Sequence, residues 1–563
     1  MNKRVLLGMT LMASLAFYSC TKEIVIVQEG GEGGIETPTA QDGQVLTLQV
    51  ANSGDGLTTR AGRPLLSSQA KQDINTIVLY VVNGESKVVL EKTITPEEWK
   101  NALAYNNTSG HGKQLQISFK NSDKQKLADG SYTIYAVGYY ETEANYKNIK
   151  IASAPTTTGE GSTPVLFPEN GLYALLNNDA NPAEEIFAGQ VEVTAKTDEQ
   201  FGSYLEVSSE STADKKVVPA LVLNRQVAGV TGYFTNLPAK VGDQIPAKVR
   251  LVASGKSNMV HFTSMFFGET DGTTTAAATN VVNGSASSLT AENLPYWNST
   301  NKGYKVYEIA LSDFFTEMSG ESSKTFDKLD YDGDGFVGYK DAQYYVYKMG
   351  ERSNGDGEPI NFTDLAQADT DGKTFLEKTW ASAIKGESVT VNEKTITANK
   401  LENFWKNKED YKGKQTLVAG SVFAGEFIIP FLKVSGVNTF ELQLLDKDGN
   451  ILKNWNVQVP NLVTDGNGSL ADGISGGPWS ADSKLVYNIY RNHLYSLGLK
   501  TTNIEGGEDP DPSEPDKPVD PKPNPDPDGS GEKEDQPEDL SKGQDLLLNV
   551  NDNWEIIHNM VID

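Results

Sequence analysis

The feature that most constrains the fold is an alternating apolar pattern at the far C-terminus. Between residues 546 and 562, seven of the nine even-numbered positions are apolar, whereas only three of the ten odd-numbered positions from 545 to 563 are. The seven are Leu546, Leu548, Val550, Trp554, Ile556, Met560 and Ile562. Successive side chains of a strand point to opposite faces, so strict alternation predicts a β-strand with one face made for burial.

An acidic, proline-rich segment separates this strand from the rest of the chain. Residues 505–539 hold nine prolines and 14 acidic residues against three lysines, a net charge of −11. Proline fixes φ and like charges repel, so residues 505–540 are predicted to be an extended linker. A lone strand cannot satisfy its own backbone hydrogen bonds. Residues 541–563 are therefore expected either to fold back onto their own sheet or to pair with another chain.

A second strand of the same design lies near the N-terminus, where residues 44–50 read QVLTLQV. Its apolar positions are Leu46, Leu48 and Val50, which repeat the spacing of Leu546, Leu548 and Val550. The loop that follows, GDGLTTRAGR at 54–63, contains Arg60 and is a preferred kind of site for a trypsin-like protease. We hypothesise that the two strands compete for one groove. A cut between Arg60 and Ala61 would free that groove for another chain's C-terminal strand.

The N-terminus has the pattern of an export signal. Lys3 and Arg4 precede an apolar run over residues 5–18, which is too short to span a membrane, and Ser19-Cys20 follows. This ending resembles a bacterial lipobox, in which the thiol of Cys20 would be acylated. The alternative is an ordinary signal peptide that ends near a cysteine. Because Cys20 is the one cysteine in the chain, an intramolecular disulfide is excluded.

The charge and the motifs argue against two functional classes. Asp and Glu outnumber Lys and Arg by 76 to 49, giving a net charge of −27, so a nucleic-acid partner is not expected. Residues 473–477 match G-x-S-x-G, but they lack the strand before and the helix after that a nucleophile elbow needs. We expect no enzyme activity, and a secreted glycan-active enzyme is a distant third hypothesis.

One segment has the spacing of a metal-binding loop. Residues 330–341 read DYDGDGFVGYKD, in which alternate oxygens could converge on Ca²⁺ and a glycine permits the sharp turn. The candidate ligands are Asp330, Asp332, Asp334, the carbonyl of Phe336 and Asp341 at the twelfth position. Asp341 stands where an EF-hand has Glu, as in dockerin-type loops. The alternative is an acidic turn that binds nothing.

The remaining local patterns indicate a mainly β protein with short helices. Residues 75–82 and 132–139 read as buried or alternating strands. Thr95-Pro96 predicts a helix start, with Thr95 as the N-cap. Residues 440–459 hold an Asp-Gly turn between two alternating runs, which predicts a hairpin. A domain boundary is expected near residues 236–240.

The order of these features resembles the fimbrillin family, the major fimbrial subunits of the type V pili of Bacteroidales, and within it the shaft subunits of minor fimbriae. The resemblance rests on the lipobox-like Cys20, on Arg60 after the first strand, and on the acidic linker before the terminal strand. Two internal stretches add to it. LNRQVAGV at 223–230 is similar to the segment that closes the first domain of those pilins, and VYNIYRNHLYSLGLK at 486–500 to their last sandwich strand.

The resemblance implies two transthyretin-like β-sandwich domains and a defined order of export, cleavage and assembly. The implied parts are a lipoprotein signal peptide (1–20), a propeptide with tether and plug strand (21–60), sandwich domains at 61–238 and 239–504, a linker (505–540) and a donor strand (541–563). The precursor would be an outer-membrane lipoprotein. An Arg-specific protease would then remove the propeptide, and subunits would join head to tail into a surface fimbrium.

The implied partners are further copies of the chain, accessory anchor and tip fimbrial proteins, and host or bacterial surface ligands. The main alternative is a surface lipoprotein adhesin, monomeric or at a fimbrial tip, that calcium stabilises.

Overall fold

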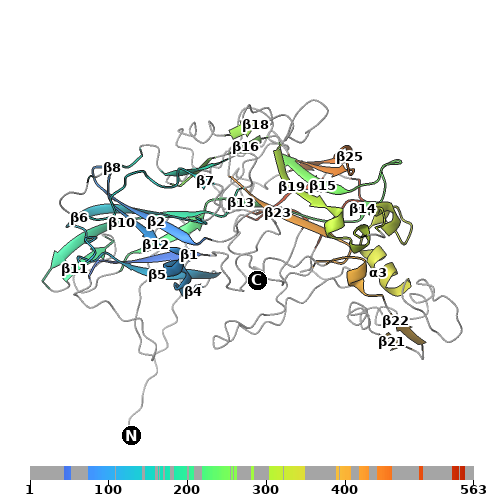
Figure 1. Ribbon diagram of the computed structural model, residues 1–563, viewed down its shortest axis with the longest axis horizontal. Helices are drawn as coiled ribbons and strands as arrows, with labels where there is room; N and C mark the ends of the chain where they lie inside the picture. Colours follow the sequence, from blue (N-terminus) through green and yellow to red (C-terminus); the bar gives the residue numbers. More distant parts are fainter. Residues whose placement is uncertain are drawn as a thin grey trace, which may run out of the picture.

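The protein is mainly β, as the sequence predicts, and its strands form two sandwiches connected by β12 and β13 (Figure 1). The computed structural model describes residues 43–51, 74–107, 110–141, 146–158, 163, 165–168, 172–177, 183–199, 202–207, 218–253, 255–257, 259–262, 281–283, 304–320, 323–348, 388–391, 394–397, 399–406, 417–429, 440–458, 494–498, 536–543 and 546–551.

The first sandwich is one curled ten-stranded sheet. Its strands are β1 (Val45–Ala51), β2 (Thr76–Asn83), β3 (Lys87–Ile94), β4 (Leu103–Asn107), β5 (Gly110–Ser118), β6 (Gly130–Tyr139), β8 (Val165–Leu166), β10 (Phe187–Asp198), β11 (Gly202–Glu206) and β12 (Ala220–Arg225). The order is β4-β5-β1-β12-β10-β6-β2-β3-β8, with β11 paired to β10. Apolar residues from β1 and β5 pack against those from β2 and β6, so the curled sheet encloses one core.

The second sandwich is built from two five-stranded sheets. One has the order β23-β13-β26-β29 with β27 on β13, and the other has the order β19-β15-β24-β25-β28. The strands of the first of these sheets are β13 (Ala228–Thr235), β23 (Val422–Ile428), β26 (Leu494–Leu497), β27 (Glu538–Asp539) and β29 (Asn549–Asn551). Those of the other are β15 (Lys248–Ala253), β19 (Tyr304–Ala310), β24 (Phe440–Leu445), β25 (Ile451–Gln458) and β28 (Leu546–Leu547). A single apolar cluster fills the space between the two sheets.

Short elements complete the described fold. They are β7 (Tyr146–Lys147), β9 (Tyr173–Leu176), β14 (Leu237–Pro238), β16 (Gly255–Ser257), β17 (Met259–His261), β18 (Val281–Asn283), β20 (Phe336–Val337), β21 (Ser388–Val391), β22 (Lys394–Thr397), the helices α1 (Pro96–Lys100) and α3 (Tyr339–Lys348), and 3₁₀ turns at Leu311–Asp313, Thr316–Met318, Phe326–Leu329 and Leu401–Asn403. A third apolar cluster joins the outer face of β2 and β6 to residues of β23 and β26, so the two sandwiches share buried surface.

The local predictions are confirmed where sequence signals were strong. β2 and β6 coincide with the predicted strands, and β24 and β25 form the predicted hairpin. Helix α1 begins after Thr95, whose hydroxyl accepts a hydrogen bond from the Glu98 amide at 3.3 Å. The Glu98 carboxylate accepts one in return from the Thr95 amide at 2.8 Å, which completes a capping box.

The change from the first sandwich to the second comes earlier than the boundary expected at 238/239. β12 ends at Arg225 in the first sheet, and β13 begins at Ala228 in the second sandwich. Residues 228–238 therefore belong to the second sandwich. Pro238, at the expected boundary, lies in β14, which pairs with β20.

Among the described residues, no helix is both long and apolar enough to cross a membrane.

Candidate functional sites

The N-terminal strand β1 lies inside the first sheet, between β5 and β12 (Figure 1). It pairs antiparallel with β5 at seven positions, from Val45 opposite Ser118 to Ala51 opposite Gly112. It pairs parallel with β12 at four positions, from Thr47 opposite Ala220 to Val50 opposite Leu223. Both edges of β1 are therefore covered by backbone partners.

The predicted plug residues are all in the core. Leu46, Leu48 and Val50 have no exposed surface and belong to the apolar cluster of the first sandwich. Burying three such side chains stabilises the sandwich by roughly 5–9 kcal/mol before ordering costs. If β1 left, β5 and β12 would each lose a ladder partner and an apolar slot would open between them.

A buried glutamine holds the start of β1. The side-chain amide of Gln44 donates to the carbonyl of Leu127 at 2.8 Å and accepts from the Leu127 amide at 2.7 Å, as a backbone neighbour would. The backbone carbonyl of Gln44 accepts from the Phe119 amide at 2.9 Å. Gln44 is 1% exposed. We name this end of the slot, at Gly43 and Gln44, its entrance.

The parallel neighbour of β1 ends in a buried ion pair. Arg225 at the end of β12 donates from Nε to Oε1 of Glu185 at 2.8 Å, and its Nη2 lies 2.7 Å from the same oxygen. Both side chains are almost fully buried, and the guanidinium lies 5.4 Å from the ring centre of Phe187. The pair fixes β12 against the start of β10, where the first sandwich meets the second.

Three residues of the proposed maturation site lie outside the described residues. These are the lipidation site Cys20 and the two sides of the cut, Arg60 and Ala61. The G-x-S-x-G match at 473–477 lies outside them too.

The C-terminal segment packs on its own second sandwich, the fold-back arrangement that the sequence left open. β28 pairs parallel with β25, with Leu546 opposite Val457. β29 pairs antiparallel with β26, with Val550 opposite Tyr495. Leu546 and Leu548 are 1% and 0% exposed, and both lie in the core of the second sandwich.

Two details differ from the predicted terminal strand. The strand is not continuous, because it changes at Leu548 from one sheet of the sandwich to the other. The folded segment also begins before residue 541, since β27 at Glu538–Asp539 pairs with β13 inside the predicted linker. The distal positions Trp554, Ile556, Met560 and Ile562 lie outside the described residues.

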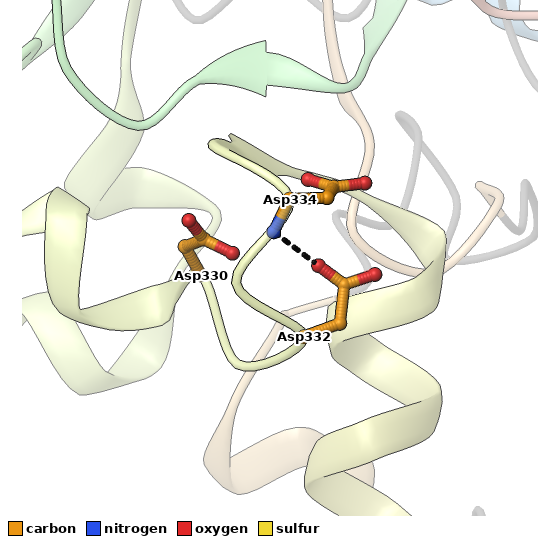
Figure 2. Close-up of side chains that lie close together, drawn as sticks. All are labelled: Asp330, Asp332 and Asp334. Carbon is orange, nitrogen blue, oxygen red and sulfur yellow. Dashed lines mark hydrogen bonds between the residues drawn. The ribbon is translucent and has the colours of Figure 1, made fainter. Parts of the chain in front are cut away.

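The acidic loop brings three of its predicted ligands together (Figure 2). One carboxylate oxygen from each of Asp330, Asp332 and Asp334 lies within 4.8 Å of the others. Positive φ angles of 78° at Gly333 and 92° at Gly335 allow the chain to turn this tightly. The Asp332 carboxylate accepts a hydrogen bond from the Asp334 amide at 3.0 Å.

Asp341, the twelfth position, is placed differently from its expected role. One of its oxygens accepts hydrogen bonds from the amides of Tyr331 and Asp332, at 2.6 and 3.3 Å, and the other accepts from the Gly338 amide at 2.8 Å. It is 2% exposed and is not among the three converging carboxylates. Its carboxylate thus closes the loop onto the start of α3.

The electrostatics of the loop reflect burial and crowding. Burial raises the pKa of Asp341 to about 7, although hydrogen bonds from the Gly338 and Tyr331 amides oppose the rise. Burial also raises the pKa of Asp332, and the charges of Asp334 and Asp330 add to the increase. A divalent cation among these carboxylates would relieve that repulsion.

The loop is attached to the β13–β14 corner. β20 inside the loop pairs with β14, and the Ala239 amide donates to the Gly335 carbonyl at 2.9 Å. Asn236 has a φ of 51°. It packs so closely on Gly338 that a Cβ atom on residue 338 would collide with the Asn236 side chain. The same corner receives the C-terminal segment, because Leu540 donates its amide to the Thr235 carbonyl at 3.1 Å.

No protein-family model matches the chain, and no curated protein matches it. Among solved structures, a candidate adhesin from Bacteroides ovatus is 10% identical, covers 81% of this chain and 89% of its own, and has a TM-score of 0.27. The fimbrial anchor protein Mfa2 from Porphyromonas gingivalis is 9% identical over 81% and 90% of the two chains, with a TM-score of 0.24. The C-terminally truncated tip fimbrial protein Mfa3 from the same organism is 8% identical over 80% and 93%, with a TM-score of 0.23. TM-scores at this level do not assign the chain to a family.

Proposed function

We propose that the chain is a structural shaft subunit of a surface fimbria. In this proposal it is exported as a lipoprotein precursor acylated at Cys20, is cleaved after Arg60, and polymerises head to tail by strand exchange. It has no catalytic role. Anchor and tip proteins would terminate the filament, which would carry adhesion to host or bacterial surfaces.

The observation that carries the proposal is the position of β1. It is an internal strand with a backbone partner on each side, yet it lies on the N-terminal side of the Arg60 loop in the sequence. A single cut at Arg60 would therefore detach a strand from the middle of a folded sheet. The slot left behind would need a replacement with Leu-x-Leu-x-Val spacing, which the chain carries at residues 546–550.

Head-to-tail exchange also agrees with general rules of assembly. The donor strand and the slot lie on different parts of the subunit, so the contact is heterologous, and in this proposal it is one that does not close into a ring. Such contacts build open filaments. A replacement strand would regain the ladder hydrogen bonds of β5 and β12 and the apolar burial that β1 gave up.

The proposal is tested by cleavage in solution. We expect purified chain carrying Cys20→Ser, treated with an Arg-specific protease, to form ladders that resist SDS without boiling. A matched chain ending at Leu540 should be cut as fast and form none. Polymerisation of the truncated chain as well as the intact one would rule out strand donation. Cleavage without ladders in the intact chain would favour the monomeric or tip-located adhesin.

Register gives a sharper test. By the common spacing, Leu547 would stand where Thr47 now lies opposite the exposed Gln116 of β5. A chain with Cys20→Ser, Gln116→Cys and Leu547→Cys should form intermolecular disulfides after cleavage. In the control, Leu548→Cys replaces Leu547→Cys, and its thiol should face the core and link poorly. Equal linking by both would contradict this register.

We propose as a second function that the acidic loop binds Ca²⁺ through Asp330, Asp332 and Asp334, with the Phe336 carbonyl. The convergence of three carboxylates within 4.8 Å favours it, because calcium takes six to eight oxygen ligands. Asp341 would hold the loop in shape through the amides of Tyr331 and Gly338. Calcium would thus stabilise the corner formed by β14 and β20.

Calorimetry distinguishes binding from an acidic turn. We expect Ca²⁺ to bind and to raise the melting temperature of the second sandwich, and Asp332→Asn with Asp334→Asn to abolish both effects. Asp448→Asn, in the exposed β24–β25 turn, is the control and should leave binding unchanged. An identical melting curve with calcium and with chelator would exclude the site.

A further inference from the structure

The apolar pattern of β1 leaves its register open. A slip of one residue would turn the leucines to the other face of the sheet, so burial excludes it. A slip of two residues would place Leu48 where Leu46 lies and Val50 where Leu48 lies, all on the same face. Apolar contact alone therefore admits registers two residues apart, and a polar contact is needed to choose between them.

Gln44 supplies that polar contact. It precedes Leu46 by two positions, so its side chain lies on the same face as the leucines, and it is 1% exposed. Its carboxamide donates to the Leu127 carbonyl at 2.8 Å and accepts from the Leu127 amide at 2.7 Å. A primary carboxamide carries a donor and an acceptor side by side, which matches the two backbone groups of one residue. Neither an apolar side chain nor a carboxylate offers both.

The backbone that receives Gln44 is held in place by contacts of its own. The Thr158 hydroxyl donates to the carbonyls of Lys124 and Lys126, at 3.0 and 2.9 Å. Leu127 is 1% exposed, and its side chain lies in the core of the first sandwich. Its two backbone groups are therefore preorganised. A strand that gave them no partner would leave both buried and unsatisfied.

The residue before Gln44 is also restricted by the slot entrance. Gly43 has a φ of 29°, and a Cβ on it would collide with the backbone carbonyl of Ser203 in β11. A side chain at this position would therefore displace β11 or the strand. The entrance thus favours a strand in which glycine precedes the glutamine.

The same start occurs once more in the chain, ahead of the same apolar pattern. GQVLTLQV at 43–50 and GQDLLLNV at 543–550 share the glycine, the glutamine, both leucines and the valine. Gly543 has a φ of 30°, but a Cβ on residue 543 would meet nothing within 4 Å. In the second sandwich only the φ of residue 543 favours glycine, whereas the slot entrance also excludes a Cβ.

Resting on the strand exchange proposed above, we propose that the backbone of Leu127 is a binding site for a glutamine side chain, which fixes the register of any strand in the slot. Its ligand is an extended segment that contains Gly-Gln-x-Leu. β1 fills the site through Gln44 in the uncut chain. A strand without the carboxamide would still bury its apolar face but would lose the bonds that distinguish one register from the next.

Substitutions at Gln44 in the uncut Cys20→Ser chain test the site before any exchange. Gln44→Met fills the space without hydrogen bonds and should lower the melting temperature equally at pH 4.5 and pH 8. In Gln44→Glu, the protonated carboxyl offers a donor and an acceptor, whereas the ionised form cannot donate to the Leu127 carbonyl. Its loss in melting temperature, relative to the parent at the same pH, should be at least twice as large at pH 8. Gln49→Met is the control and should change little, because the Nε2 of Gln49 makes no hydrogen bond within the described residues.

Disulfide traps measure the register itself. Thr47→Cys and Gln116→Cys are opposite in the observed register. Thr47→Cys and Ser118→Cys would be opposite only after the two-residue slip that brings Leu46 to Leu127. In the uncut Cys20→Ser chain, the first pair should link at least tenfold faster than the second. Adding Gln44→Met should narrow this ratio at least fivefold, and adding Gln49→Met should leave it within about twofold.

An unchanged ratio in Gln44→Met, or a loss in Gln44→Glu that does not depend on pH, would overturn the site whether or not the cleaved chain assembles. After cleavage, Gln544→Met should form at least tenfold fewer SDS-resistant ladders than the parent, and Asn549→Met should form as many. Equal ladders from Gln544→Met would overturn the part of the site in exchange and leave exchange standing. No ladders from the parent would overturn exchange alone, because the site is judged in the uncut chain.

Discussion

The two segments with the Leu-x-Leu-x-Val pattern differ in how they pair with neighbouring strands. β1 pairs at seven positions with β5 and at four with β12, all within one sheet. Residues 546–551 pair at two positions with β25 and at three with β26, which belong to different sheets. Leu46 and Leu48 of β1 are fully buried, and their counterparts Leu546 and Leu548 are at most 1% exposed, so for these two positions the difference lies in the backbone ladder and not in burial.

This difference bears on how readily each strand leaves its place. A segment with few ladder bonds opens locally at a lower free energy than one paired on both sides. β1 therefore has more ladder contacts than residues 546–551. In the strand exchange proposed above, residues 546–551 would open from the second sandwich more readily than β1 opens from the first, so β1 is the strand whose release would need a cut.

The largest expected effect is on the ion pair that fixes β12, the parallel neighbour of β1. Arg225→Met should destabilise the first sandwich by about 3–5 kcal/mol, because it leaves the buried carboxylate of Glu185 without its guanidinium partner. Urea denaturation, monitored by near-ultraviolet circular dichroism, measures the loss in the free energy of unfolding. Lys87→Met, which breaks an exposed pair with Glu85, is the control and should leave the stability nearly unchanged. A similar small cost for Arg225→Met would show that the pair does not hold β12.

A matched pair of leucines tests the comparison directly. Leu48→Ala should cost about 2–5 kcal/mol, the usual range for a buried leucine. Leu548→Ala should cost less, because local opening of residues 546–551 limits what any substitution there can remove. Denaturation gives the two losses, and hydrogen exchange should show faster exchange at 549–551 than in β1. Equal losses and equal exchange would contradict the difference between the strands.

The acidic loop should make the stability of the second sandwich depend on pH in a way that the stability of the first sandwich does not. The pKa of Asp341 is raised in the fold to about 7, above its unfolded value near 4, so the folded state holds the proton more tightly. With chelator present, the stabilisation that protonated Asp341 gives the fold is complete below about pH 4 and is lost as the pH rises to 7. Melting temperatures between pH 4.5 and 7.5 should fall more steeply in the parent than in Asp341→Asn. Parallel profiles would refute the assignment.

The smallest effect is expected at helix α1 of the first sandwich. Thr95→Ala removes the N-cap hydroxyl and should cost about 1 kcal/mol in that sandwich only. Glu97→Gln keeps the capping box and serves as the control in the same denaturation experiment. A loss shared by the second sandwich would mean that the two sandwiches unfold as one unit.

Local sequence patterns were sufficient to predict the elements whose geometry depends on residues close together in the sequence. Alternation identified β2 and β6, and the Thr95-Pro96 pair identified the start of α1. The spacing at 330–334 predicted three converging carboxylates. In each case, residues close in sequence determine the geometry, so a single sequence carries the signal.

The contacts that a sequence alone could not supply are non-local. Nothing near residue 47 indicates that β1 should pair in parallel with Ala220, more than 170 residues away. Glu538 and Asp539 have the composition of a linker, and their strand exists because the end of β13 offers a free edge. The spacing placed Asp341 among the ligands, but its carboxylate is not one of the three that converge; it accepts the amides of Tyr331 and Gly338 instead, a detail set by the turn onto α3.

The parallel pairing of β1 with β12 has a mechanical consequence. A strand pulled lengthwise between two neighbours is loaded in shear, so its ladder bonds must yield together and not one after another. β1 and any strand that replaces it in the slot are loaded this way when tension acts along the chain. A joint of this kind would be weak to peeling from its entrance and strong to stretching, as the proposed fimbrial role would require.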